Sequence, residues 1–310
     1  MPEGVSVRTL LSERIVASAI SNPQFVVLSG DHGYALFDAL RAQRPNQFLN
    51  VGIAEQAMVG YAAGLAKTGF RPLVYGLSAF VPLRVLEQIK LDVCYPALPV
   101  IFLGDGAGLV YSTLGSSHQC GEDIACLRPL PNIAIYSPCD AYELATCFDE
   151  ALHSKTASYI RIGKSDRPAV NLMPPSTTEP YFTHESSSTK LCVISSGSLV
   201  SVAKDLGEKL DIPTMSVPRI QPFPQQLAKS LLRFQFLVIL EEHSRFGGLF
   251  SSLAETMSEM EAKDRPRFFS LSLKNQFAEK CGSYQYALAE HALSDRDIER
   301  RLLEIIHSIA

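Results

Sequence analysis

Within residues 50–64, the carboxylate of Glu55 is the side-chain group best suited to take part in a reaction. It falls in the first turn of a predicted helix whose other residues are almost all small or apolar. We expect such a helix to be buried, which leaves Glu55 with little water around it. The helix N-terminus favours the anion of Glu55, whereas desolvation favours the protonated acid. A buried carboxyl that keeps its proton near neutral pH can donate a hydrogen bond to a ring nitrogen.

Two interpretations of Glu55 follow from this segment. A hydrogen bond to an aminopyrimidine ring is what activation of thiamine diphosphate requires, because it favours the imino tautomer that removes the thiazolium proton. The alternative is a glutamate placed in a first turn for its interaction with the helix dipole, worth ~0.3–1 kcal/mol. One glutamate on a helix does not separate the two.

A second candidate is His118, in a loop rich in Gly and Ser just before the acidic pair Glu122 and Asp123. Loops after buried parallel strands are where α/β sheets bind ligands. There His118 can move protons to and from a carbonyl oxygen. The alternative is a loop histidine bonded to a backbone carbonyl. Upstream, Phe80 and Arg84 are either a core aromatic and a solvated cation, or a wall for a planar ring.

Two other patterns suggest metals, and we interpret both differently. Gly104, Asp105 and Gly106, followed by Asn132, imitate the diphosphate and magnesium signature of thiamine enzymes. The following residues read as a loop rather than a helix, so we take the match as accidental and expect no metal ligand in this chain. Within 241–248, Glu241, Glu242 and His243 are consecutive. Adjacent side chains diverge, so we do not expect these three to hold one metal ion together. A structural or interface network is therefore the expected role.

The composition excludes several classes of protein. The 28 basic and 32 acidic residues form no long runs, so a nucleic-acid partner is not expected. No apolar segment reaches the roughly 20 residues that span a bilayer, and the first residues lack a signal-peptide core. We therefore expect a cytoplasmic protein. The seven cysteines form no Cys-x-x-Cys pair and are expected to be reduced.

Short apolar runs alternate with helical patterns along the chain, which is typical of parallel sheets covered on both faces. The first series has expected strands at 24–29, 48–51, 72–75, 99–103, 133–136 and 159–162. Helices are expected at 80–92, after Ser78, and at 141–153, after Asp140. A stretch rich in Pro, Ser and Thr, in which several prolines are expected to prevent regular structure, reads as a linker, and a second α/β series follows it. The sequence thus predicts two tandem α/β domains, residues 1–168 and 190–310, joined by a linker at 169–189.

Taken together, these segments resemble the C-terminal half of transketolase: a pyrimidine-binding domain followed by the transketolase C-terminal domain. The resemblance covers nearly the whole chain. It rests most on residues 50–64 with Glu55, on 78–89 with Phe80 and Arg84, and on 117–125 with His118. The segments 128–132 and 136–140 continue the pattern.

The resemblance implies roles for these residues. Glu55 would contact the aminopyrimidine of thiamine diphosphate, and Phe80 would stack on it, with Arg84 beside them. Asp31 falls at an acidic position near the cofactor. His118, with Gln119, would reach the substrate. Arg8 and Lys164 align with two positions that touch the phosphate of a sugar substrate in the family. The family usually has Arg at the second of these positions.

Two departures from the family are informative. Leu114 stands where the family carries an Asp that binds a sugar hydroxyl, and Gly106 stands where it usually has a His directed at the acceptor. An isobutyl group cannot replace a hydrogen-bond acceptor. An ordinary pentose-phosphate transketolase is therefore not expected, and the donor, acceptor and pathway remain open.

We also expect a split enzyme, because the domain that binds the diphosphate and Mg²⁺ in full-length transketolases precedes the part that this chain resembles. The chain would be the beta-type subunit of a thiamine diphosphate-dependent transketolase-like enzyme. A partner alpha-type subunit would hold the diphosphate and Mg²⁺ in an alpha2beta2 assembly. The enzyme would move a two-carbon unit from a ketone or 2-oxo acid to an aldehyde-like acceptor. The alternatives are the beta subunit of a 2-oxoacid dehydrogenase and a non-catalytic partner subunit.

Overall fold

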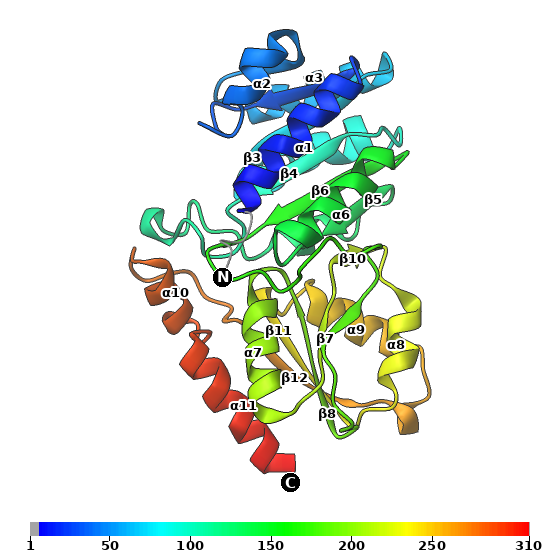
Figure 1. Cartoon of the computed structure of the whole chain (residues 1–310), viewed down its shortest axis with the longest axis vertical. Coiled ribbons are helices and arrows are strands. Elements are labelled where there is room, and N and C mark those ends of the chain that lie inside the picture. The colour runs from blue at the N-terminus through cyan, green and yellow to red at the C-terminus, as the bar shows by residue number, and fades with distance from the viewer. Residues whose placement is uncertain (1–5, 310) are drawn as a thin grey trace.

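The computed structural model describes residues 6–309, apart from the side chain of Asp264. It contains two α/β halves stacked along the long axis of the molecule, the first coloured blue to green and the second mainly yellow to red (Figure 1). The predicted fold class, two tandem units built on mainly parallel sheets, is confirmed. The domain and linker boundaries stay predictions, and the expected start at residue 1 lies outside the described residues.

The first sheet has seven strands in the order β10-β5-β6-β4-β3-β1-β2, all parallel except β10. Its strands are β1 (Phe25–Ser29), β2 (Phe48–Asn50), β3 (Arg71–Leu77), β4 (Ile101–Asp105), β5 (Ile133–Tyr136), β6 (Ala157–Ile162) and β10 (Arg219–Gln221). The last strand comes from the second half of the sequence and pairs antiparallel with β5. The two halves therefore share a sheet.

Helices cover both faces of this sheet because successive strand residues alternate between two cores. Val26 and Leu28 pack with α3 (Glu55–Lys67), and Phe25 and Val27 pack with α1 (Val7–Ser21) and α6 (Ala141–His153). The predicted start of α6 is confirmed, since the Asp140 side chain accepts a hydrogen bond of 2.8 Å from the Glu143 N–H. This half also contains the short helices α2 (Asp38–Gln43) and α5 (Asp123–Leu127).

The second sheet has the order β12-β11-β8-β9-β7, with only β7 antiparallel. Its strands are β7 (Tyr181–His184), β8 (Leu191–Ser196), β9 (Thr214–Ser216), β11 (Phe236–Ser244) and β12 (Arg267–Leu273). One face carries α7 (Val200–Leu210), α10 (Tyr284–Glu290) and α11 (Asp295–Ile309), and the other carries α8 (Gln225–Leu231) and α9 (Leu249–Ser258) (Figure 1). Within residues 6–309, no helix is long and apolar enough to cross a membrane.

The structure corrects three expectations. The linker 169–189 is not free of regular structure, because β7 lies within it and pairs with β9. The helix expected at 80–92 is not a regular α-helix: a 3₁₀ turn at Leu83–Val85 leads into Leu86–Gln88 (α4), which continues as a π-helix at Ile89–Cys94. Finally, α3 is buried on one face only, and Gln56, Ala57, Gly60, Tyr61 and Gly64 are exposed.

Candidate functional site

Glu55 is the first residue of α3 and lies beyond the carboxyl edge of the first sheet. The segment 51–54 brings it back from the end of β2, and its side chain is only 3% exposed. Its Oε2 accepts a hydrogen bond of 3.0 Å from Nη1 of Arg84. Its Oε1 is buried and has no hydrogen-bond partner among the described residues. A buried polar atom without a partner costs free energy. Oε1 is therefore suited to form a hydrogen bond with a bound ligand.

Arg84 and two rings complete the surroundings of this carboxyl. The Arg84 guanidinium carbon lies 4.1 Å from the centre of the Phe80 ring, as a cation–π pair. The His118 imidazole meets the same ring edge to face, with centroids 5.3 Å apart. The structure thus brings Glu55, Arg84, Phe80 and His118 into one cluster, although 63 positions separate the first from the last.

The loop after β1 borders this cluster. Asp31 has a positive φ of 61° and accepts a hydrogen bond of 3.1 Å from the Asn50 side chain, which ties the loop to β2. The next residue, His32, is not singled out by the sequence, yet its ring lies 6.2 Å from that of Phe80. Its position directly after a buried strand and an acidic residue was the available signal.

His118 is half-buried in the loop between β4 and α5. Its Nδ1 lies 2.9 Å from the Ser117 hydroxyl, so one ring nitrogen is engaged locally. The loop is closed at its base by a pair of backbone hydrogen bonds between Gly108 and Cys120. Leu114, where the resemblance led us to expect a sugar-binding Asp, is 52% exposed on the same loop.

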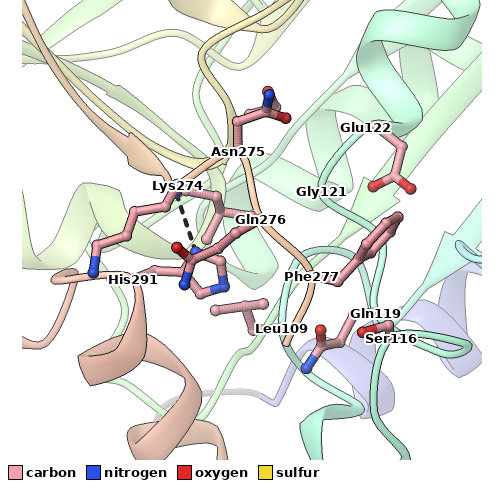
Figure 2. Close-up of a pocket in the computed structure, with 12 residues that line it drawn as sticks. Leu109, Ser116, Gln119, Gly121, Glu122, Lys274, Asn275, Gln276, Phe277 and His291 are labelled. Carbon is pink, nitrogen blue, oxygen red and sulfur yellow. Dashed lines mark hydrogen bonds between the residues drawn. The ribbon is translucent and has the colours of Figure 1, made fainter. Parts of the chain in front are cut away.

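Gln119 lines a cavity of about 490 Å³ between the two halves, to which the first half contributes Ser116 and Glu122 and the second half contributes Phe277 and His291 (Figure 2). The Gln119 Nε2 is buried and has no partner among the described residues. Whether Gln119 contacts substrate therefore stays a prediction.

Arg8 and Lys164 line one cavity of about 280 Å³, as positions that share a ligand must. Arg8 donates a hydrogen bond to the Tyr34 carbonyl, and Lys164 pairs with Asp166 at 3.2 Å. The cavity also holds Asp105, which the sequence indicates only as part of an accidental metal pattern.

The side chains around Asp105 explain why Gly106 is tolerated. Asp105 accepts hydrogen bonds from the hydroxyls of Tyr75 at 2.7 Å and Tyr111 at 3.2 Å. A Cβ on Gly106 would lie 1.9 Å from the Tyr111 ring, so this ring fills the space of the missing side chain. Asn132 precedes β5 and therefore lies at the opposite edge of the sheet from Asp105, at the end of β4. The two cannot share a metal ion, and within residues 6–309 no group of three or more acidic, His or Cys side chains is placed to hold one.

The acidic segment at the end of β11 joins the two halves. Arg161 is buried and donates to the Asp123 carboxylate at 2.9 Å and to the Glu242 carbonyl at 2.7 Å. His243 Nε2 lies 3.8 Å from Asp123 Oδ1. Glu241 accepts hydrogen bonds from the first N–H groups of α9. This is a structural network between halves, as the sequence predicted.

The parallel sheet, with a buried carboxyl and an aromatic ring at its carboxyl edge, defines a domain suited to a flat nitrogen heterocycle. Residues 3–168 match the family described as transketolase, pyrimidine binding domain. The chain belongs to the transketolase family, and the predicted resemblance is confirmed.

Two relatives illustrate the range of the family. The chain is 30% identical over 267 residues to a subunit of apulose-4-phosphate transketolase from Phocaeicola vulgatus, covering 82% of this chain and 84% of that protein. It is 33% identical over 285 residues to 1-deoxy-D-xylulose-5-phosphate synthase of Lawsonia intracellularis, covering 88% of this chain but 43% of that protein. This chain thus spans less than half the length of the second relative.

Solved structures give the same picture. A structure described as split gene transketolase, inactive beta4 tetramer, superimposes with a TM-score of 0.86 at 27% identity, over 97% of this chain and 98% of that one. Transketolase from Campylobacter jejuni superimposes with a TM-score of 0.76 at 16% identity, over 97% of this chain and 46% of that one. The second likeness concerns the fold alone.

Proposed function

We propose that the chain is the beta-type subunit of a cytoplasmic, two-component, thiamine diphosphate-dependent transketolase-like enzyme. The enzyme transfers a two-carbon unit from a ketone or 2-oxo acid donor to an aldehyde-like acceptor. The observation that carries the proposal is the buried Glu55, with Oε2 held by Arg84 and Oε1 free. When bound, thiamine diphosphate supplies the carbon nucleophile that breaks and makes the carbon–carbon bonds.

The residues of this chain have distinct tasks in the proposal. Glu55 bonds the aminopyrimidine ring through its free oxygen, and Phe80 packs against the ring. Arg84 fixes the Glu55 carboxyl and the Phe80 ring relative to each other. His118 lies against Phe80 and exchanges a proton with the substrate oxygen. Asp31 borders the same site.

Arg8 and Lys164 contact the far end of the substrate in this proposal. They line one cavity, which supports a shared ligand. Lysine offers a point charge where arginine would offer a planar pair of donors, so a phosphate there is held with less geometric control.

The proposed partner is an alpha-type subunit that holds the diphosphate and Mg²⁺, in an alpha2beta2 assembly. The exposed face of α3 supports a contact at this position, because a Cβ built on Gly60 or Gly64 meets no atom within 4 Å in this chain. Small residues permit close approach of another backbone. The relative from P. vulgatus is itself named as a subunit, which agrees with a divided enzyme.

The test is reconstitution with the partner subunit. Glu55→Gln should lower two-carbon transfer at least ~100-fold, because general acid–base catalysis contributes ~10²–10⁴-fold. Glu13→Gln, an exposed change on α1, is the matched control and should leave transfer unchanged. Turnover by Glu55→Gln at the wild-type rate would refute the proposal. Transfer to a lipoyl group rather than to an aldehyde would identify a 2-oxoacid dehydrogenase subunit instead.

A further inference from the structure

The loop that carries His118 is attached to the second half of the molecule at both of its ends. At its start, the Leu109 N–H donates a hydrogen bond of 2.7 Å to Oε1 of Glu242, on β11. At its end, the Gly121 carbonyl accepts a hydrogen bond of 2.7 Å from the Ser244 N–H, two residues further along the same strand. A single strand of the C-terminal half therefore holds both ends of this loop.

The middle of the loop touches the C-terminal half as well. The Ser112 carbonyl accepts a hydrogen bond of 3.4 Å from the Gly282 N–H. A Cβ on Gly115 would lie 2.9 Å from the Cys281 sulfur, so the two segments are in close contact. Gly115 in turn accepts hydrogen bonds from the backbone of His118 and Gln119. The backbone beside His118 is thus braced from outside its own half.

Glu242 is built for this contact. Its side chain is only 2% exposed, and its other oxygen accepts hydrogen bonds of 2.5 Å from the hydroxyls of Ser198 and Tyr284. A Cβ on Gly108 would lie 2.3 Å from Oε1, so only glycine at that position lets the carboxylate reach the Leu109 N–H. The carboxylate orientation is fixed by two donors on the C-terminal side, and the remaining oxygen faces the loop.

We propose that Glu242 is a positioning residue that fixes the loop backbone at Leu109 and thereby sets the place of the His118 imidazole. The catalytic consequence rests on the proposed function of His118, whereas the bracing of the loop does not. The C-terminal half then has a task beyond assembly, since it orients a side chain of the first half at the site. Small displacements of a reacting group cost up to ~100-fold in rate.

The variants are Glu242→Ala and Glu242→Gln, in the chain assembled with its partner. Alanine removes the acceptor for Leu109, whereas glutamine keeps a carbonyl oxygen for it. Glu255→Ala is the matched control, because Glu255 also joins the halves, through Arg128 at 2.5 Å, but does not touch the loop. The first measurement is hydrogen exchange of the peptides covering residues 109–121. The second is the steady-state kinetics of two-carbon transfer.

We expect faster exchange of this loop in Glu242→Ala and wild-type exchange in Glu242→Gln and Glu255→Ala. We expect kcat of Glu242→Ala to fall about tenfold or more, with KM changing less, and substantial recovery in Glu242→Gln. Unchanged loop exchange in Glu242→Ala, or equal loss of kcat in the Ala and Gln variants, would overturn the inference. A wild-type pair without any transfer would refute the proposed function, while the exchange measurement would still decide whether the loop is braced.

If Glu242→Ala does not fold, Tyr284→Phe and Ser198→Ala each remove one donor to Glu242 while keeping its carboxylate. Both should speed exchange of the loop by a smaller factor than the alanine variant. Wild-type exchange in both would overturn the inference in the same way.

Discussion

The Arg84 guanidinium donates a hydrogen bond of 3.0 Å to Oε2 of Glu55. This ion pair is unequal, because the Glu55 side chain is 3% exposed and that of Arg84 is 44% exposed. The cation therefore reaches a buried acid from the solvent side while it covers the Phe80 ring. It ties the acid and the ring of the proposed pyrimidine site together and leaves Oε1 of Glu55 available.

Arg84→Met should weaken binding of thiamine diphosphate to the assembled enzyme about tenfold, which corresponds to ~1.4 kcal/mol. Without the cation, Oε2 of Glu55 loses its donor and Phe80 loses its cation–π contact. Arg84→Lys should recover only part of the affinity, since a point charge cannot bond the carboxylate and cover the ring in the same way. The measurement is a cofactor titration by calorimetry.

Arg14→Met is the control for this titration, because it removes an ion pair with Asp149 that joins α1 to α6 and contacts neither Glu55 nor Phe80. It should bind the cofactor as the wild type does. Equal affinity of Arg84→Met and Arg14→Met would contradict the role assigned to Arg84.

Much of the architecture was predictable because local signals agree with it. The buried strands read as apolar runs, and Asp140 marks the start of α6 as an N-cap should. The strands β7 and β10 were missed. Each has three or four residues, and each is defined by antiparallel pairing with a segment 30 or more positions away, which no local pattern reports.

The candidate site was predictable in part for a similar reason. Glu55 lies at the start of a helix and His118 lies in a loop after a buried strand, and both features can be recognised in the sequence. The brace from Glu242 to Leu109 joins positions 133 apart, and the ring of His32 comes close to Phe80 only through the fold. The sequence also could not show that one face of α3 is exposed. An apolar helix face has the same residue pattern whether its own chain or a partner covers it.

The cavity between Arg8 and Lys164 should discriminate a phosphorylated substrate from its unphosphorylated counterpart. Lys164→Met should raise KM for a phosphorylated aldehyde about tenfold, since hydrogen bonds to charged groups contribute ~1.5–3 kcal/mol. The same change should leave KM for the unphosphorylated aldehyde nearly constant. Asp105→Asn should lower KM for the phosphorylated substrate, because it removes a negative charge from this cavity.

Initial rates with both aldehydes, over a range of concentrations, provide the measurement. Lys263→Met, an exposed change in the C-terminal half, serves as the control. If Lys164→Met changed both KM values by the same factor, the cavity would not be a phosphate subsite.

Substitutions on the exposed face of α3 should affect assembly with the partner without preventing the chain from folding. Gly60→Ala should stabilise the isolated chain by ~0.5–1 kcal/mol, because alanine favours a helix interior and its Cβ meets no atom within 4 Å. Gly60→Leu should also fold, yet its larger side chain should prevent close approach of the partner. Urea unfolding of the isolated chain and native mass spectrometry of the mixed subunits check the two statements. Assembly of the Leu variant as tight as that of the Ala variant would contradict the proposed contact.

Two buried groups on β11 should make stability depend on pH in opposite directions. Burial raises the pKa of Glu241 to about 7, although two backbone N–H groups of α9, Arg161 and Arg128 favour its anion. Burial lowers the pKa of His243 to about 4, although the neighbouring Asp123 favours the imidazolium. The ordinary pKa values are 4.5 for the glutamate and 6.5 for the histidine.

The sign of each contribution follows from which form the fold favours. The fold favours protonated Glu241, so its contribution is complete below pH 4.5 and is lost as the pH rises towards 7. The fold favours neutral His243, so its contribution is complete above pH 6.5 and is lost as the pH falls towards 4. Each change amounts to roughly 3 kcal/mol, and the two largely cancel between these limits.

Single variants should expose the two contributions. We expect the free energy of unfolding of Glu241→Gln, relative to the wild type, to rise as the pH increases from 4.5 to 7, because only the wild type loses the glutamate contribution. For His243→Gln the relative free energy should fall over the range from 4 to 6.5, because only the wild type gains the histidine contribution. Urea unfolding at matched ionic strength measures both differences. If neither difference changed with pH, these buried groups would titrate with the same pKa in the folded and unfolded chain, and their burial in the network between the halves would be wrong.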